Sequence, residues 1–137
     1  METIKYTIFL SNYLRDTLST FSNTELRLTI FLFEVLINKN EEEFSVLLDE
    51  FISGWYEEQD NQIVQVISAT GLSESEIFSG LEEVKDRGLF TFKSINSKNK
   101  KGMRSFIFKS NISLAINHMK NFNFYNSPNE DTENKKA

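Results

Sequence analysis

The sequence lacks several residues on which common protein chemistries depend. Its 137 residues include no cysteine and a single histidine, His118, so we expect neither a disulfide framework nor a metal site. The serines have no recognisable base beside them, and the five glycines are scattered instead of forming a phosphate-binding loop. No apolar run approaches the roughly 18 residues that cross a bilayer. We therefore expect a cytoplasmic protein with no membrane contact, no cofactor and no enzymatic activity.

Phenylalanine, by contrast, is abundant. Thirteen of these side chains occur in a chain that is 39% hydrophobic, and each contributes a large apolar surface to a core. A chain of this length suits one globular domain with one core. The last segment, residues 127–137, has no apolar anchor. We predict a single domain over residues 1–126, with N- and C-terminal extensions, and a disordered tail over residues 127–137.

The net charge of −5 conceals an uneven distribution. Residues 41–86 contain thirteen acids and one base, Lys85, whereas residues 87–120 contain eight bases and no acid. A protein polarised in this way can place its basic segment on a polyanion while its acidic segment points away. The charge distribution therefore keeps nucleic acid among the expected partners, although the net charge alone argues against a nucleic-acid partner.

Apolar spacing predicts three helices in the first half of the chain. We expect one over most of residues 8–20, a strongly apolar one over residues 26–37, and an amphipathic one over residues 44–55. The third would form an extra packing layer. Alternatively it would form a docking or dimer surface, because Trp55 and Tyr56 are residue types enriched at interfaces.

Residues 62–109 organise the rest of the chain. Apolar spacing from residue 63 predicts a helix that ends at Gly71. Ser73 and Glu76 fit a capping box that begins a second helix. Alternating residues on both sides of a basic loop then predict a two-stranded hairpin.

The run Ala69-Thr70-Gly71-Leu72-Ser73, followed by Leu81-Glu82-Glu83-Val84-Lys85-Asp86-Arg87-Gly88-Leu89 and a hairpin, resembles the winged helix-turn-helix superfamily of DNA-binding domains. The resemblance covers about a third of the chain. It implies a mainly α fold with a small β-hairpin, in which the second helix is a recognition helix, the hairpin is a wing and additional helices flank the motif. It also implies sequence-specific or semi-specific binding of double-stranded DNA. The composition resembles that of plasmid and phage proteins, so the expected role is transcription regulation, or DNA replication or partition control on a mobile element.

Lysine and arginine side chains contact phosphates, and serine can hydrogen-bond to any base. The candidate DNA-binding residues are accordingly Ser73, Ser75 and Ser79 in the recognition helix, and Lys93, Lys98, Lys100, Lys101, Arg104 and Lys109 in the wing. The alternative for the wing is an ordinary solvated lysine-rich loop. The acids later in the recognition helix would be repelled by a duplex, so the wing is expected to anchor the protein.

Two partner questions stay open at this point. Terminal helices often build dimers in the winged-helix superfamily, so we expect a homodimer formed through the N-terminal segment and residues 111–119. A second interpretation makes the chain a protein–protein interaction module or inhibitor that acts through the acidic face between residues 41 and 86.

Overall fold

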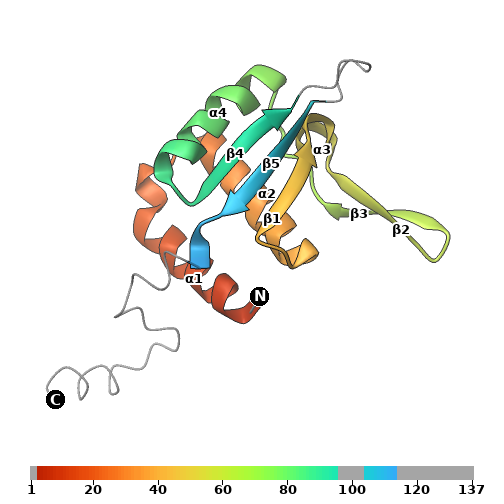
Figure 1. Ribbon diagram of the computed structural model, residues 1–137, viewed down its shortest axis with the longest axis horizontal. Coiled ribbons are helices and arrows are strands. Elements are labelled where there is room, and N and C mark those ends of the chain that lie inside the picture. Colours follow the sequence, from red (N-terminus) through yellow and green to blue (C-terminus); the bar gives the residue numbers. More distant parts are fainter. Residues whose placement is uncertain (1–2, 96–103, 114–137) are drawn as a thin grey trace, which may run out of the picture.

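The computed structural model describes residues 3–95 and 104–113 (Figure 1). The helices are α1 (Thr3–Thr17), the 3-10 helix η1 (Leu18–Thr20), α2 (Asn23–Lys39), α3 (Leu48–Ser53) and α4 (Glu74–Arg87), and the strands are β1 (Glu43–Leu47), β2 (Trp55–Gln59), β3 (Gln62–Ile67), β4 (Phe90–Ile95) and β5 (Ser105–Ser110). Strands β1, β5 and β4 form an antiparallel sheet in that order, and β2 pairs with β3 in a separate hairpin. The predicted tail over residues 127–137 lies outside the described residues.

The expectation of a mainly α winged helix-turn-helix with one small hairpin is wrong as a description of the fold. The described residues contain five strands beside the four α-helices, so the fold is mixed α/β. Two segments expected to be helical account for the difference, residues 44–55 and the stretch from residue 63 to Gly71.

The first of these segments divides into a strand and a short helix. Phe44 and Val46 are buried on one side of β1, whereas Glu43 and Ser45 are exposed on the other, which is the alternation of a strand with one covered face. Apolar residues at 44, 47, 48 and 51 also fit a helical period, so spacing alone does not separate the two. Pairing with β5, far along the chain, decides in favour of the strand.

The second segment is β3, so the first helix of the expected helix-turn-helix is absent from the described residues. The strand is rich in β-branched residues, which favour extended backbone. Asp60 and Asn61, with φ of 52° and 65°, form the two-residue turn that joins it to β2. Two left-handed residues are what a type I′ hairpin requires. The short helix α3 and the β2–β3 hairpin therefore precede α4.

Other predictions of helices and strands are confirmed. Helix α4 begins with the expected capping box, in which Ser73 accepts from the Glu76 N–H and Glu76 accepts from the Ser73 N–H, and it ends at Gly88. Strands β4 and β5 form the expected hairpin. The apolar helix expected over residues 26–37 is α2, capped by Ser22.

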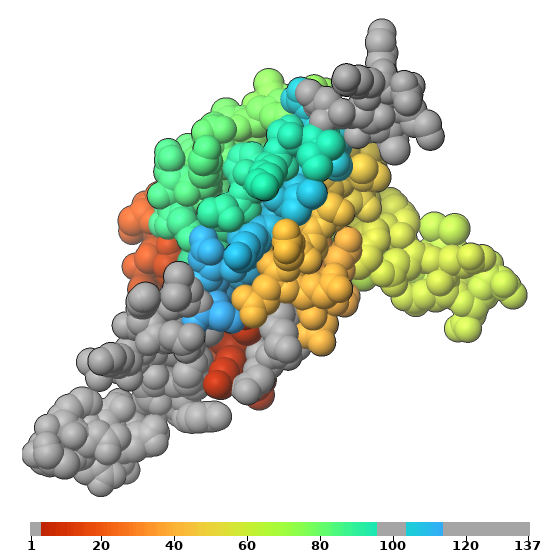
Figure 2. Space-filling view, in the orientation of Figure 1, coloured from red at the N-terminus to blue at the C-terminus, as the bar shows by residue number. Residues whose placement is uncertain are grey.

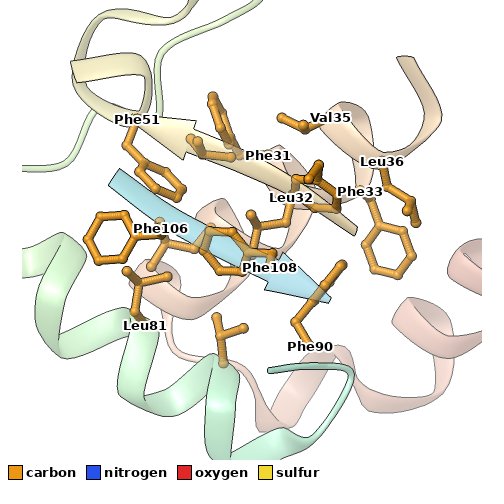
Figure 3. Close-up of a cluster of buried hydrophobic side chains, with 14 of the residues drawn as sticks. Phe31, Leu32, Phe33, Val35, Leu36, Phe51, Leu81, Phe90, Phe106 and Phe108 are labelled. Atoms are coloured by element: carbon orange, nitrogen blue, oxygen red, sulfur yellow. The ribbon is translucent and has the colours of Figure 1, made fainter. Parts of the chain in front are cut away.

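Helices α2 and α4 enclose the core on one face of the three-stranded sheet. Phe106 and Phe108 of β5 lie at its centre, surrounded by side chains of α2 and α4 (Figure 3). Gly80 allows the two helices to approach closely, since a Cβ there would lie 2.5 Å from atoms of both Leu28 and Thr24. Helix α1 packs against the same core through its side chains Tyr6 and Phe9.

An ion pair between the half-buried Arg87 and the buried Glu25 connects the end of α4 to the beginning of α2. The Arg87 guanidinium binds both carboxylate oxygens of Glu25, which is only 4% exposed, and it also donates to the Thr20 carbonyl oxygen at 3.1 Å. It lies 3.7 Å from the centre of the Phe21 ring. The hydrogen bond with Glu25 raises the pKa of Arg87 above its ordinary value.

Among the helices of the described residues, none combines the length and apolar character needed to cross a membrane.

Candidate nucleic-acid interface

The exposed side of α4 carries a mixed polar stripe. Ser75, Phe78, Ser79 and Glu82 follow one another at helical spacing on this side, whereas Ile77, Leu81 and Val84 are buried against the core. The three polar members of the stripe are exposed and Phe78 is half-buried. The stripe therefore offers hydroxyl groups beside one accessible aromatic ring.

The three serines predicted to contact DNA differ in what they already bind. Ser73 is the helix cap, because its Oγ accepts from the Glu76 N–H at 3.2 Å. The Ser75 hydroxyl lies 3.3 Å from that of Ser73, and the Ser79 hydroxyl donates to the Glu76 carbonyl oxygen at 3.2 Å. Ser75 and Ser79 are exposed and their oxygens retain acceptor capacity, so these two fit a contact role better than Ser73 does.

Capping also fixes the charge of the first turn of α4. The backbone N–H of Ser73 hydrogen-bonds to the Glu76 carboxylate at 2.8 Å, and this bond holds the pKa of Glu76 below its ordinary value. The N-terminal end of α4 thus presents negative charge as well as hydroxyl groups.

Arg104 is brought against the same side of α4. Its guanidinium lies 4.9 Å from the centre of the Phe78 ring, within the range of a cation–π contact. Phe78 in turn packs against Phe106 of β5 at a centroid distance of 6.0 Å. The backbone of Arg104 is also fixed, since its carbonyl oxygen accepts from the Leu48 N–H at 2.8 Å. One surface therefore combines Arg104 with Ser75 and Ser79.

Lys93 and Lys109 lie on the other face of the three-stranded sheet. Along β4 and β5 they alternate with Phe92, Phe106 and Phe108, which contact the core on the α4 side. They line a hollow on the outer face together with Glu43, Thr91 and Ile107 (sheet face toward the viewer in Figure 2). The structure thus separates these two lysines from Ser75, Ser79 and Arg104.

The remaining candidates, Lys98, Lys100 and Lys101, lie outside the described residues. Strand β4 ends at Ile95 and β5 begins at Ser105, the residue that follows Arg104, and Ile95 pairs with Ser105. Their attachment points are therefore beside the surface that holds Arg104.

Sequence reasoning missed the part played by Phe78. This residue is apolar like Ile77, but it follows Ile77 directly and so lies about 100° away around the helix. This angular offset from Ile77 was the sequence signal that Phe78 lies to one side of the buried face of the helix. Half-buried, Phe78 connects the core to Arg104 instead of filling the core.

The described residues contain no cluster of three or more histidine, cysteine, aspartate or glutamate side chains suited to a metal ion. Comparison with protein-family models, with curated proteins and with solved structures found no match for this chain.

Proposed function

We propose that this protein binds double-stranded DNA through α4 and the β4–β5 hairpin. The observation that carries the proposal is the position of Arg104, which lies over Phe78, a ring on the same side of α4 as the exposed Ser75 and Ser79. A guanidinium next to hydroxyl groups on one helix side combines a phosphate ligand with potential base contacts. Helix α4 followed directly by a hairpin is the part of the winged-helix resemblance that supports this proposal.

The acids of α4 determine how such a surface would approach a duplex. Glu82 and Asp86 are exposed along the later turns of the helix and would be repelled by phosphates. Attraction would have to come from Arg104 and from the lysines of the β4–β5 connection, as sequence reasoning also expected. The start of α4, with Ser75 and Ser79, would then enter the groove while its last turns stay outside. The role would be transcription regulation, or replication or partition control of a plasmid or phage.

The test is a fluorescence-anisotropy titration of the protein against random duplex DNA at two salt concentrations. Each phosphate contact contributes about 0.9 to the slope of log K against log salt. Replacing Lys98, Lys100 and Lys101 with alanine is expected to reduce that slope by up to about 2.7 and to weaken binding steeply at low salt.

A variant with Lys120, Lys135 and Lys136 replaced by alanine loses the same charge from the end of the chain and serves as the matched control. It should bind as the unmodified protein does. Equal affinity of the two variants would refute the proposal. Absence of any salt-dependent binding by the folded protein would favour the second candidate, a protein-interaction module acting through its acidic face.

A further inference from the structure

The β2–β3 hairpin extends from the body of the molecule as an arm (Figures 1 and 2). Its base is fixed, because Lys39 lies 5.2 Å from the centre of the Trp55 ring and Gly54 leaves no room for a side chain between Ile67 and Gln65. Beyond the base, two apolar side chains are open to solvent: Ile63 is 72% exposed and Tyr56 is 49% exposed. A two-stranded hairpin of this kind is only marginally stable in water without a further strand or a packing partner.

The two edges of the arm have different chemistry. Strand β2 carries Glu57 and Glu58, and charged side chains of this kind discourage a second strand from pairing. Strand β3, with the sequence QIVQVI, contains no charge, no proline and no glycine, and four of its six residues are β-branched. Within the described residues β3 pairs only with β2, so its other edge is free for hydrogen bonding. An uncharged, β-branched free edge is the feature that recruits another strand.

We propose that β3 pairs antiparallel with β3 of a second copy of this chain, which gives a four-stranded sheet in the order β2, β3, β3 of the second copy, β2 of the second copy. This order joins the two uncharged edges and leaves the glutamates on the two outer strands. Pairing through β2 would instead bring Glu57 and Glu58 close to the same residues of the second copy. The inference concerns the arm alone and does not depend on DNA binding.

The register of the arm also fixes the register of the dimer. Pairs in an antiparallel ladder alternate between hydrogen-bonded and non-hydrogen-bonded, and a two-residue turn is closed by a hydrogen-bonded pair, here Gln59 and Gln62. Backbone groups of Ile63 and Gln65 therefore point toward the free edge. When Ile63 lies opposite Gln65 of the second copy, the outward backbone groups of both residues form hydrogen bonds in each copy. This register places Val64 opposite Val64 of the second copy, at the two-fold axis.

That register gives a specific crosslinking test in a chain that has no cysteine of its own. Val64 would form a non-hydrogen-bonded pair with Val64 of the second copy. Their Cα atoms would be about 4.5 Å apart, which is within the range that a disulfide spans. Glu57 lies opposite Val64 in the arm. In the dimer, Glu57 of the two copies would be separated by three inter-strand spacings, or about 14 Å. With oxidised glutathione as the oxidant, Val64→Cys should form an interchain disulfide at least about tenfold faster than Glu57→Cys. Equal rates, or no crosslink in either variant, would overturn the proposal.

Sedimentation of the unmodified protein and of Ile63→Pro provides an independent measurement. The Ile63 N–H points outward, so proline there removes a bond to the second copy while keeping the bonds within the arm. The unmodified protein should sediment as a dimer. Loss of one hydrogen bond from each copy should weaken association by about tenfold or more, with an unchanged far-UV circular dichroism spectrum. A monomeric unmodified protein, or a folded Ile63→Pro variant that dimerises as tightly, would also overturn it.

Discussion

The ion pair between Arg87 and Glu25 is expected to be one of the most important single polar contributions to stability. Replacing Arg87 with leucine leaves the Glu25 carboxylate, 4% exposed, without its charged partner. It also removes two hydrogen bonds to Thr20 and the contact with the Phe21 ring. Breaking a buried pair from one side costs about 3–5 kcal/mol. We expect Arg87→Leu to lower the free energy of unfolding by that amount.

Urea unfolding followed by fluorescence measures this loss conveniently, because Trp55 is the single tryptophan and is half-buried at the base of the arm. The double variant Glu25→Leu with Arg87→Leu is the informative control. Removing both charges leaves no unpaired group, so the double variant should recover much of the stability that the single variant loses. A loss of less than about 1 kcal/mol in Arg87→Leu, or a double variant no more stable than the single one, would refute this account of the pair.

Two further predictions test the packing of α4 and the proposed interface. Gly80→Ala should lower the free energy of unfolding by about 1–3 kcal/mol in the same urea assay, because the added methyl group meets Leu28 and Thr24 at 2.5 Å; an unchanged midpoint would contradict the close approach of α2 and α4. Arg104→Ala should weaken DNA binding in the anisotropy titration and reduce the salt slope by about 0.9, whereas Lys109→Ala, which removes the same charge from the opposite face of the sheet, should have no effect. Equal losses would contradict the separation of the two residues.

The parts of the fold that could be predicted from the sequence are those governed by local chemistry. Ser22 and Ser73 cap α2 and α4, and Gly88 ends α4 with a left-handed conformation. Each of these signals lies within a few residues of the structure that it determines, so a sequence pattern contains it completely. The β4–β5 hairpin was predictable for the same reason, since its strands are close in the chain and both alternate.

Strands β1 and β3 could not be assigned by the same reasoning. Apolar residues at positions 44, 47 and 48, and again at 63, 66 and 67, satisfy a helical period, whereas those at 44, 46 and 48, and at 64 and 66, satisfy an extended one. For β1 the deciding interaction is pairing with β5, which no local pattern reveals. For β3 a local signal was present in Asp60 and Asn61, which adopt the left-handed conformations of a tight hairpin turn. The prediction followed the helical spacing instead.

The candidate site was predictable in composition but not in arrangement. A count of charges treats every base between residues 87 and 120 as equivalent, yet Arg87 is held by Glu25 and Lys93 lies on the face of the sheet away from α4. Arg104 gained its position from Phe78 and from the backbone contact with Leu48, and both are tertiary interactions. A charge pattern does not show which side chains are buried or on which face of the fold they lie. These two properties determine which cations can contact the same ligand.

These positions make a single copy of the chain a weak ligand for DNA. The proposed interface uses Arg104 and the three lysines between residues 96 and 103, and four phosphate contacts give a slope of log K against log salt of only about −3.6. The exposed acids of α4 oppose even this attraction. Two copies joined through β3 would present twice as many cations to one duplex without any new contact in either copy, because the second interface would bind at the high effective concentration set by the first. Dimerisation through the arm would therefore turn a surface with few cations into a useful DNA ligand, provided that both interfaces reach the same duplex.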